Sequence, residues 1–506
     1  MNRTIAVLGS SLLLVVILLA VMVDRPDPDR TAAEARPPVL LFCAASNRAV
    51  MEAVRTDYEA ETGRRVEIQY GASQTLLSSL EVSRTGDLYL PADDSYLALS
   101  AEKGLTEEVL PLATMRGVVV VPKGNPRNIS AFSDLLKPDL KLVQANPDAA
   151  AIGKVTRATL QQQNLWDSLA EATTAYRGTV SEVANDVMVG AADAGIAYDA
   201  VLSTYPDLQA VELPELQDTA SQISVAVVAT SQQPTAALHF ARYLAAEDRG
   251  LKRYAEFGFR PVQGDVWEDT PELTMFAGSM LRPAIENTIA AFEKREGVRV
   301  SRVYNGCGIL VAQMKAGQHP DTYFACDTEF MKQVPDLFPE SVSVSQNQLV
   351  ILVAKGNPLD ITSLKDLTKP GLKVGIGHEK QCAMGWLTQN TLKEGGLQQE
   401  VMENVTVQTP TGDMLVNQLR TGSLDAAVAY LSNAAGSGEF LDAVPIEGIA
   451  CSIATQPFAI AEKSPHRHLA ARLFQQLCSA DSQQTFADEG FRFQWTDSSK
   501  PTNAAD

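Results

Sequence analysis

Short apolar runs alternate with amphipathic segments along most of this chain. The runs Val66 to Tyr70, Gly117 to Val121 and Leu140 to Val143 are short and rich in β-branched or other apolar residues, which is typical of strands. The segments Arg48 to Glu61 and Ser181 to Gly190 place their apolar residues at helical spacing. This alternation predicts an α/β fold built on parallel sheets, with ligands at the carboxyl ends of the strands.

The pattern occurs twice. The segment Lys123 to Pro126 returns unchanged as Lys355 to Pro358, an offset of 232 residues (123 to 355). The same offset links two further pairs of segments, Ala194 to Tyr198 with Ala426 to Tyr430, and Gly258 to Arg260 with Gly490 to Arg492. A period of this length indicates a duplicated domain rather than a solenoid repeat.

The repeat gives the domain organisation. We predict copy 1 over residues 38–265 and copy 2 over residues 270–495, with a joint near Pro261 to Pro271. The turn Pro122 to Pro126, near the middle of copy 1, suits a crossover between two parts of the copy. Each copy is therefore expected to be a two-lobed, hinged binding unit.

The first residues predict a membrane element, which we place at residues 1–24. Ile5 to Val23 carries no charge, with Arg3 before it and Asp24 after it. A membrane-spanning helix needs about 20 apolar residues, and a cleavable signal has a shorter apolar region of about 7–15. The favoured interpretation is an uncleaved membrane anchor, and the alternative is a signal peptide that is cleaved near Ala33-Glu34-Ala35. Either one places the remainder outside the cytoplasmic membrane. Residues 25–37 are rich in Pro, Asp and Ala, which is typical of a linker.

Composition and charge narrow the choice of partners. The chain has 506 residues, of which 45% are hydrophobic and 20% charged, as in ordinary globular proteins. Its formal net charge of −19 and the lack of a Lys/Arg-rich tract argue against nucleic acid. The same charge does not exclude an anionic ligand, since salt screens long-range fields over about 8 Å and a cleft can be locally favourable.

Two short stretches carry the candidate chemistry. Ala44-Ala45-Ser46 and Gly71-Ala72-Ser73 each place a serine directly before an apolar-periodic run, so both serines are predicted to be helix N-caps. Helix starts with small residues and hydroxyls can hold an anion without a basic side chain. The arrangement returns as Phe276 to Ser279 and Asn305 to Gly308, where Cys307 replaces the second serine.

Each copy resembles the molybdate-binding proteins of bacterial ABC importers, which belong to the type 2 periplasmic-binding superfamily. The resemblance covers nearly the whole chain and rests on the order and spacing of several motifs, not on any single one. In copy 1 these are Ala44 to Ser46, Tyr58 to Gly63, Tyr70 to Ser73, Gly86 to Asp93 and Ala192 to Tyr198. The resemblance implies two tandem two-lobed α/β domains of that type after an N-terminal transmembrane helix.

The resemblance also implies a ligand site. In that family an oxyanion is bound by two serines of one lobe, by backbone amides of the other lobe and by a tyrosine hydroxyl. Carried onto copy 1, these positions are Ser46, Ser73, Ile152, Val180 and Tyr198. Ile152 departs from the pattern because a bulky residue stands where a small one is usual, although its backbone amide remains. Taken singly, each serine could be a plain cap and Tyr198 a packing residue.

Copy 2 departs further from the pattern. The corresponding positions are Ser279, Cys307, Met384, Gly412 and Tyr430. A thiol is a weaker donor than a hydroxyl, and Asp413 beside Gly412 would repel a dianion unless it points away. We therefore expect copy 2 to have altered or lost oxyanion specificity.

Three cysteines map around the copy 2 cleft, namely Cys307, Cys326 and Cys382. They could be buried inert thiols. Alternatively, Cys307 and Cys326 could form a disulfide, which an oxidising compartment favours. A third possibility is a soft metal site that uses all three, although no C-x-x-C spacing supports it.

The predicted function is extracytoplasmic capture of molybdate or tungstate for an ABC permease, by a monomer without a cofactor. The same fold could bind sulfate, phosphate or a metal ion, or act as a membrane-anchored sensor. An enzyme is disfavoured because the chain has no H-E-x-x-H, G-x-S-x-G or P-loop motif. The protein is expected to be periplasmic and anchored to the cytoplasmic membrane by residues 5–23.

Overall fold

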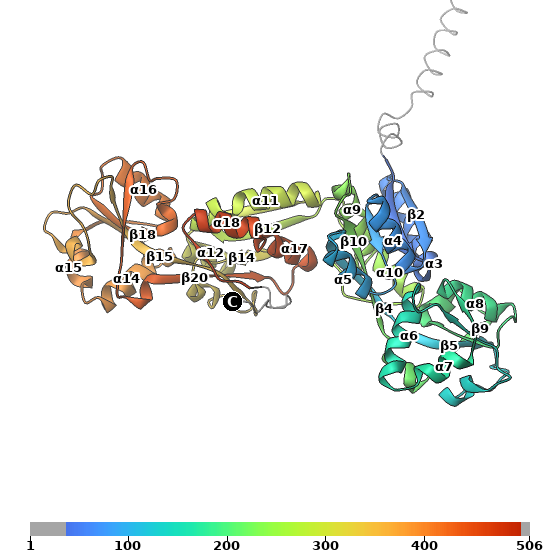
Figure 1. The fold of residues 1–506 in the computed structure, drawn as a ribbon. Coiled ribbons are helices and arrows are strands. Elements are labelled where there is room, and N and C mark those ends of the chain that lie inside the picture. The colour runs from blue at the N-terminus through green and yellow to red at the C-terminus, as the bar shows by residue number, and fades with distance from the viewer. Residues whose placement is uncertain (1–36, 497–506) are drawn as a thin grey trace, which may run out of the picture. The chain divides into compact units, whose positions relative to one another are not determined.

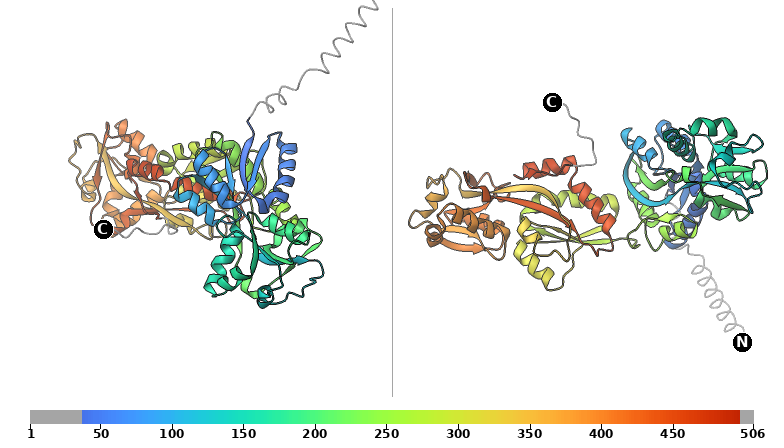
Figure 2. Two further views of the ribbon diagram at one scale, coloured as in Figure 1. Left: turned by 45° about the vertical axis from the view of Figure 1, so that its right-hand side comes forward. Right: turned by 90° about the horizontal axis from the view of Figure 1, so that it is seen from below.

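The computed structural model describes residues 37–496, which divide into two compact units, one ending at Gly264 and the other beginning at Asp265. The predicted membrane anchor lies outside the described residues. Within residues 37–496, no helix combines the length and the apolar character that a membrane crossing needs. Figure 1 shows two lobes in each unit, and Figure 2 shows them from two further sides.

The first lobe of unit 1 contains a six-stranded sheet in the order β11-β4-β10-β3-β1-β2. Its strands are β1 (Val39–Ala44), β2 (Val66–Gly71), β3 (Leu88–Leu90), β4 (Thr106–Met115), β10 (Ser221–Val228) and β11 (Arg260–Pro261). Its helices are α3 (Arg48–Thr62), α4 (Ser73–Ser83), α5 (Ser95–Glu102), α9 (Pro234–Leu244) and α10 (Gly250–Glu256). Buried apolar side chains of the sheet and these helices form its core, among them Leu41, Tyr58 and Phe240.

The second lobe of unit 1 contains a five-stranded sheet in the order β7-β6-β8-β5-β9. Its strands are β5 (Gly117–Pro122), β6 (Leu142–Ala145), β7 (Thr173–Arg177), β8 (Ala194–Tyr198) and β9 (Leu208–Val211). Its helices are α6 (Ala151–Gln162), α7 (Trp166–Ala172) and α8 (Val180–Met188), drawn in teal and green in Figure 1.

The elements predicted from the hydrophobic pattern are present. Arg48 to Glu61 corresponds to α3, which Gly63 ends with a left-handed φ of 67°. The prediction of parallel sheets is wrong for part of each sheet, because β4 and β10 run antiparallel in the first sheet, as do β5 and β8 in the second. In the second sheet, β5 enters from the first lobe and runs antiparallel to β8, whereas β6 is parallel to both β7 and β8.

The predicted crossover position is also wrong. The chain passes between lobes at Arg116, between the end of β4 and the start of β5, and not at the turn Pro122 to Pro126. That turn lies at the far end of β5, where Gly124 and Asn125 have positive φ angles of 86° and 46°. Its Gly-Asn-Pro composition therefore indicates a tight turn after a strand and not a hinge.

Unit 2 repeats this architecture. Its strands are β12 (Glu272–Gly278), β13 (Arg299–Asn305), β14 (Thr322–Phe324), β15 (Val342–Ala354), β16 (Val374–Gly377), β17 (Val405–Thr409), β18 (Ala426–Tyr430), β19 (Leu441–Pro445), β20 (Ile453–Ile460) and β21 (Arg492–Phe493). Its helices are α11 (Arg282–Glu296), α12 (Cys307–Lys315), α13 (Thr328–Met331), α14 (Ala383–Glu394), α15 (Gln398–Asn404), α16 (Gly412–Arg420), α17 (Arg467–Leu477) and α18 (Ala480–Asp488).

One strand of unit 2 crosses both lobes without a break. β15 pairs with β20 and β21 at its start and with β18 and β19 at its end. The two lobes of this unit are therefore joined into one ten-stranded arrangement, whereas in unit 1 the corresponding strands β4 and β5 belong to separate sheets.

Candidate functional site

The strand register of unit 1 brings the two predicted serine stretches together. β1 and β2 are parallel neighbours, with Ala44 opposite Gly71 at their carboxyl ends. Ser46 and Ser73 follow those ends directly, so they lie at the same edge of the sheet. In the second lobe, α6 follows β6 and α8 follows β7, and both helices begin on the side that faces these serines.

A small cavity of about 20 Å³ lies where these ends meet, enough for one compact group and not for an extended molecule. All five predicted positions of copy 1 line it. Its lining consists of Ala44, Ala45, Ser46, Gly71, Ala72, Ser73, Ala92, Ala150, Ala151, Ile152, Thr179, Val180 and Tyr198. No lining residue carries a charge, and the polar side chains present are hydroxyls.

The prediction that both serines are N-caps is wrong. Ala72 occupies the N-cap position of α4, and Ser73 is the first residue of that helix. Ser46 lies inside a short 3-10 turn, η1 (Ala45–Asn47), whose N-cap is Ala44. Because neither hydroxyl caps a helix, both are available to line the cavity.

Hydrogen bonds orient both serine hydroxyls. The oxygen of Ser73 accepts from the backbone N–H of Ala92 at 3.1 Å, and that of Ser46 accepts from the side-chain amide of Asn47 at 3.3 Å. Both serines are buried. Since the oxygens act as acceptors in these bonds, the hydroxyl protons are left to donate to a ligand in the cavity.

The opposite lobe supplies two helix starts. Ala150 precedes α6 without a side-chain capping bond, and Ile152 is the second residue of that helix. Thr179 caps α8 by accepting from the N–H of Glu182 at 3.3 Å, and Val180 is the first helical residue. First-turn N–H groups have no intrahelical acceptor and carry the positive end of the helix dipole, so both starts favour an anion.

The bulky Ile152 does not block the cavity. Its Cδ1 atom packs beside Gly117 at the start of β5, 3.1 Å from where a Cβ on that glycine would stand. The side chain thus contributes to the core near the crossover, while its backbone N–H remains in the first turn of α6.

Tyr198 ends β8, and its hydroxyl shares a 2.9 Å hydrogen bond with the hydroxyl of Ser221. Burial raises the pKa of Tyr198 far above its ordinary value, with the Ser221 contact acting in the opposite direction. The phenol is therefore neutral at physiological pH and able to donate. Ser221 was not identified from the sequence. Its replacement in copy 2, described below, is the signal that could have identified it.

The two lobes of unit 1 touch across the cavity. The backbone N–H of Gln74, in the first turn of α4, donates to the carbonyl of Ala149 before α6 at 3.2 Å. Lys154 of α6 contacts Ser95 at 3.0 Å and lies 4.5 Å from the ring centre of Tyr96 in the other lobe. The described arrangement is therefore a closed one, with the cavity between the lobes.

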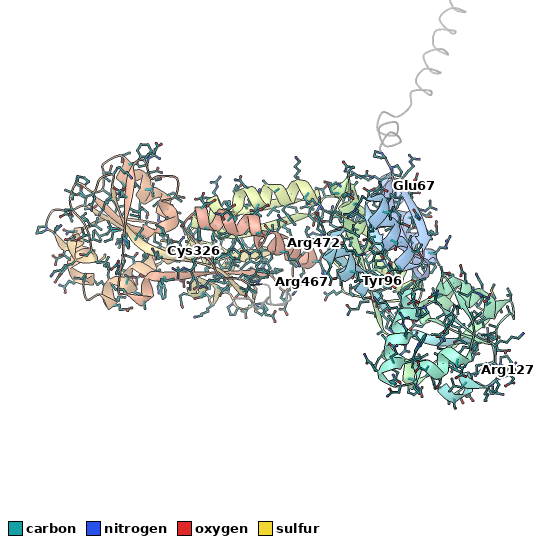
Figure 3. The ribbon with its side chains drawn as sticks, viewed as in Figure 1. Glu67, Tyr96, Arg127, Cys326, Arg467 and Arg472 are labelled. Carbon is teal, nitrogen blue, oxygen red and sulfur yellow. A yellow bond between two sulfur atoms is a disulfide. The ribbon has the colours of Figure 1, made fainter. Side chains whose placement is uncertain are left out.

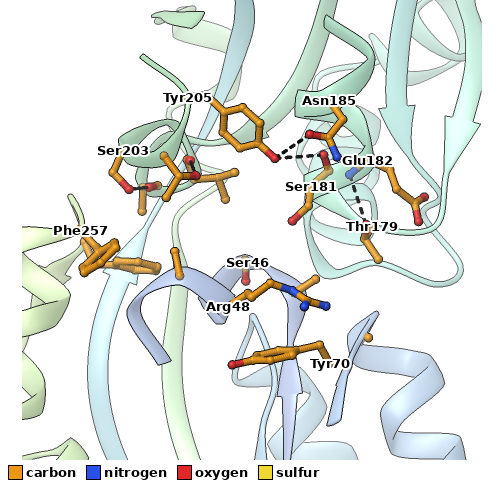
Figure 4. A pocket seen from close by; sticks show the side chains of 17 residues that line it. Ser46, Arg48, Tyr70, Thr179, Ser181, Glu182, Asn185, Ser203, Tyr205 and Phe257 are labelled. Carbon is orange, nitrogen blue, oxygen red and sulfur yellow. Dashed lines mark hydrogen bonds between the residues drawn. The ribbon is translucent and has the colours of Figure 1, made fainter. Parts of the chain in front are cut away.

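A wider pocket of about 620 Å³ adjoins the small cavity and shares Ser46, Gly71 and Thr179 with it (Figure 4). The guanidinium of Arg48 lies 4.2 Å from the ring centre of Tyr70 in this pocket. Its charged lining residues are Arg48 and Glu182, one of each sign.

The copy 2 cleft contains a disulfide between Cys307 and Cys326 (Figure 3 labels Cys326), which confirms that alternative. The backbone N–H of Cys326 points to the sulfur of Cys307 at 3.0 Å, just as Ala92 does to Ser73 in copy 1. The three-cysteine metal site is wrong, because two of its ligands are consumed in the disulfide. Among residues 37–496, no cluster of metal-binding side chains is found.

Cys382 has a local structural contact instead. Its sulfur accepts from the N–H of Gly385 at 3.4 Å as the N-cap of α14. Burial raises the pKa of its thiol to about 11. Cys382 is therefore a neutral thiol at physiological pH.

At two of the remaining copy 2 positions, neighbouring side chains take up space in the cleft. Ser279 begins the turn η5 (Ser279–Leu281), and Met384 is buried in the first turn of α14. A Cβ at Gly278 would collide with the sulfur of Cys326, and one at Gly412 would collide with the amide of Asn433. These glycines stand where copy 1 has Ala45 and Val180, so the extra groups of copy 2 occupy space that is open in copy 1.

Two further differences change the donors and charges of the copy 2 cleft. The buried hydroxyl of Tyr430 has no hydrogen-bond partner within the described part of the chain, whereas that of Tyr198 is paired with Ser221. Ala454 stands where copy 1 has Ser221, since both pair with equivalent residues of the crossing strands. Asp413 lies in the first turn of α16, where burial raises the pKa of its carboxyl while Arg282 and Asn433 act to lower it.

Two lobes joined by crossing strands, repeated in both units and closed over a small neutral cavity in unit 1, define the class of two-lobed ligand-binding domains. A family model described as bacterial extracellular solute-binding protein matches residues 39–260 and again 273–492. The chain therefore belongs to that family and carries its domain twice.

Several known proteins are similar to one copy of the domain. The molybdate-binding protein ModA of Mycobacterium tuberculosis is 28% identical over 217 residues, covering 41% of this chain and 79% of the relative. A putative binding protein of Haemophilus influenzae is 25% identical over 223 residues, covering 44% and 90%.

Solved structures also match one copy at a time. The substrate-binding domain of a putative molybdenum ABC transporter from Clostridium difficile is 24% identical, with a TM-score of 0.37, and covers 45% of this chain and 99% of its own. The sulfate-binding protein SubI of Mycobacterium tuberculosis is 18% identical, with a TM-score of 0.39, and covers 44% and 87%.

Proposed function

We propose that copy 1 captures a tetrahedral oxyanion, molybdate or tungstate, outside the cytoplasmic membrane and delivers it to an ABC permease. The observation that carries this proposal is the small cavity lined only by uncharged residues. Two serine hydroxyls face it from one lobe, two helix starts from the other, and a neutral tyrosine hydroxyl completes the set.

The donor set suits a fully ionised oxyanion. Such an anion has only acceptors, so each N–H and O–H at the cavity wall can donate to it. Because no acidic side chain lines the cavity, none repels the anion. Because no basic side chain contacts the anion, binding depends on fixed dipoles, whose number and position select the size and shape of the anion.

The names of the relatives support the choice of ligand. Similar proteins are described as molybdate-binding, and one solved neighbour as sulfate-binding. Molybdate and tungstate are the proposed ligands, and sulfate and phosphate are the competitors to be tested. The proposed site residues are Ser46, Ser73, Ile152, Val180 and Tyr198, with Ser221 positioning the tyrosine hydroxyl.

Copy 2 is proposed not to share this specificity. The disulfide replaces the second hydroxyl and occupies part of the cleft, and Asp413 places a carboxyl one residue nearer to the helix start than Glu182 does in copy 1. Its equivalent positions Ser279, Cys307, Met384, Gly412 and Tyr430 therefore form no oxyanion site.

Calorimetric titration of the purified protein with molybdate, tungstate, sulfate and phosphate tests the proposal. We expect saturable binding of molybdate and tungstate that is lost in a Ser46→Ala, Ser73→Ala double variant. Ser279→Ala, the equivalent change in copy 2, is the matched control and should bind as the wild type does. Retention of molybdate binding in the double variant would refute the site assignment.

A further inference from the structure

The two lobes of unit 2 meet through backbone atoms at the start of α12. The N–H of Gly308, the second residue of this helix, donates to the carbonyl of Gln381 in the other lobe at 3.0 Å. The N–H of Ile309 also points to this carbonyl, at 3.3 Å. First-turn N–H groups carry the positive end of the helix dipole, and here a carbonyl of the protein itself accepts from two of them.

Two glycines let the lobes approach this closely. A Cβ on Gly306, the N-cap of α12, would stand 2.4 Å from the carbonyl oxygen of Gln381 and 2.5 Å from that of Pro410. A Cβ on Gly308 would stand 2.1 Å from the carbonyl oxygen of Lys380. These separations are far inside van der Waals contact, so a larger residue at either position would push the lobes apart.

Copy 1 has residues with a Cβ at both places. The N-cap is Ala72 in α4 and Gly306 in α12. The second helical residue is Gln74 in α4 and Gly308 in α12. The N–H of Gln74 lies 3.2 Å from the carbonyl of Ala149, and the small cavity of copy 1 lies beside this contact, with Ala72 in its wall. Copy 2 therefore brings backbone together at a place where copy 1 keeps open space.

The crossing strand adds a second restraint. The pairing of β15 passes from Gln348, opposite Ile453 of the first lobe, to Leu349, opposite Tyr430 of the second lobe, without a gap. Opening of the cleft would bend a strand that is paired along both lobes. In unit 1 the corresponding strands β4 and β5 are separated at Arg116 and belong to different sheets.

We propose that copy 2 stays closed without a ligand, with the carbonyl of Gln381 as the acceptor for the first turn of α12. Gly306 and Gly308 make room for the backbone of the other lobe, and β15 resists opening. Copy 2 is then a module of fixed shape, whereas a hinged binding domain opens and closes around its ligand. This state of copy 2 does not depend on which ligand copy 1 binds.

Hydrogen exchange of the full chain, followed by mass spectrometry of its peptides, tests this proposal. The peptide 305–312 contains the amides of Gly308 and Ile309. We expect these amides to be protected from exchange in the absence of any ligand, because the contact with Gln381 is already made. Addition of molybdate should leave their exchange unchanged.

Gly308→Ala should open the contact. Its Cβ would meet the carbonyl of Lys380, so we expect the protection of peptide 305–312 to fall about tenfold or more. Alanine favours a helix more than glycine does, so a weaker helix cannot cause this loss. Gly438→Ala is the matched control, because nothing lies within 4 Å of a Cβ at this exposed position, and it should exchange as the wild type does. Unchanged exchange in α11 shows that the first lobe of each variant is folded.

The proposal fails if the wild-type amides exchange without protection, if molybdate slows their exchange, or if Gly308→Ala keeps the wild-type protection. The peptide 71–78 of copy 1 reports on the oxyanion site in the same experiment. Its protection should rise with molybdate. A lack of that rise would count against the oxyanion site alone, so the failures of the two proposals give different results.

Discussion

One pair of equivalent residues, Ser73 and Cys307, separates the two copies at the scale of single atoms. Both occupy the first position of a helix, and both receive a backbone N–H from the loop after the third strand of their sheet. In copy 1 the side chain keeps a proton to donate. In copy 2 the sulfur is bonded to Cys326 and has none. The same backbone therefore presents a donor in one cleft and an inert group in the other.

The serine hydroxyls should carry a measurable part of the affinity of copy 1. Ser46→Ala and Ser73→Ala each remove one donor to a charged ligand, which is worth about 1.5–3 kcal/mol, or about tenfold or more in dissociation constant. Calorimetry with molybdate measures the loss. A loss of less than about twofold for both variants would mean that the hydroxyls do not contact the anion.

The pH dependence of binding should show no contribution from Tyr198. Its phenol donates only while protonated, and burial raises its pKa above the ordinary value of about 10. Ionisation would begin only above that range, so molybdate affinity should stay constant from about pH 7 to about pH 10. A decline over this interval that disappears in Tyr198→Phe would show that the phenol titrates in it.

At the scale of elements, the starts of α8 and α16 carry their acidic residue at different positions, Glu182 at the third residue of α8 and Asp413 at the second residue of α16. Ser181 is the second residue of α8, and Asp413 is the second residue of α16. An acidic residue in the first turn stabilises a helix, but the same carboxylate repels an anion bound at that helix start. The second position of α8 therefore carries no charge that would repel an anion, whereas the second position of α16 carries a carboxylate.

Ser181→Asp should weaken molybdate binding while preserving the fold of copy 1. Two unit charges about 6 Å apart repel by about 3 kcal/mol at an effective dielectric constant of about 20, so a loss of tenfold or more is expected. Ser181→Asn is the control of similar size and should bind as the wild type does. Equal affinities for the two variants would place the anion away from α8.

The cysteine chemistry of copy 2 is also an element-scale prediction, since the disulfide joins the start of α12 to the loop after β14. Alkylation of the denatured, unreduced protein should label four of the six cysteines, because Cys307 and Cys326 are paired. Reduction before alkylation should raise the number to six. Mass spectrometry of the labelled chain gives the count, and six labels without reduction would contradict the disulfide.

Sequence patterns predicted the elements that have strong local signals. The periodic helix at Arg48 and the run from Val66 were found nearly at their true bounds because burial of one face dictates their spacing. The crossover was placed wrongly because the Pro122 to Pro126 turn has a strong local signal, whereas the real crossing at Arg116 has none. The N-caps were placed one residue late or in the wrong turn, since alanine caps leave no signature.

Part of the candidate site was predicted, from a family resemblance and not from local sequence patterns. The five copy 1 positions came from a resemblance, and the structure brings them to one cavity. Ser221 could not be found from local pattern, because a serine at the start of a strand has many explanations.

At the scale of the whole molecule, a duplicated binding domain has diverged into two different clefts. Copy 1 keeps a neutral, donor-lined cavity, and copy 2 fills the same place with a disulfide and with Asn433 beside Gly412. The central claim is that the chain binds one oxyanion, in copy 1.

Native mass spectrometry of the intact protein after incubation with molybdate tests that claim most directly, since it counts bound ions per chain. The account predicts one molybdate on the wild type, one on Ser279→Ala, and none on the Ser46→Ala, Ser73→Ala double variant. Two ions on the wild type, or one retained on the double variant, would contradict it.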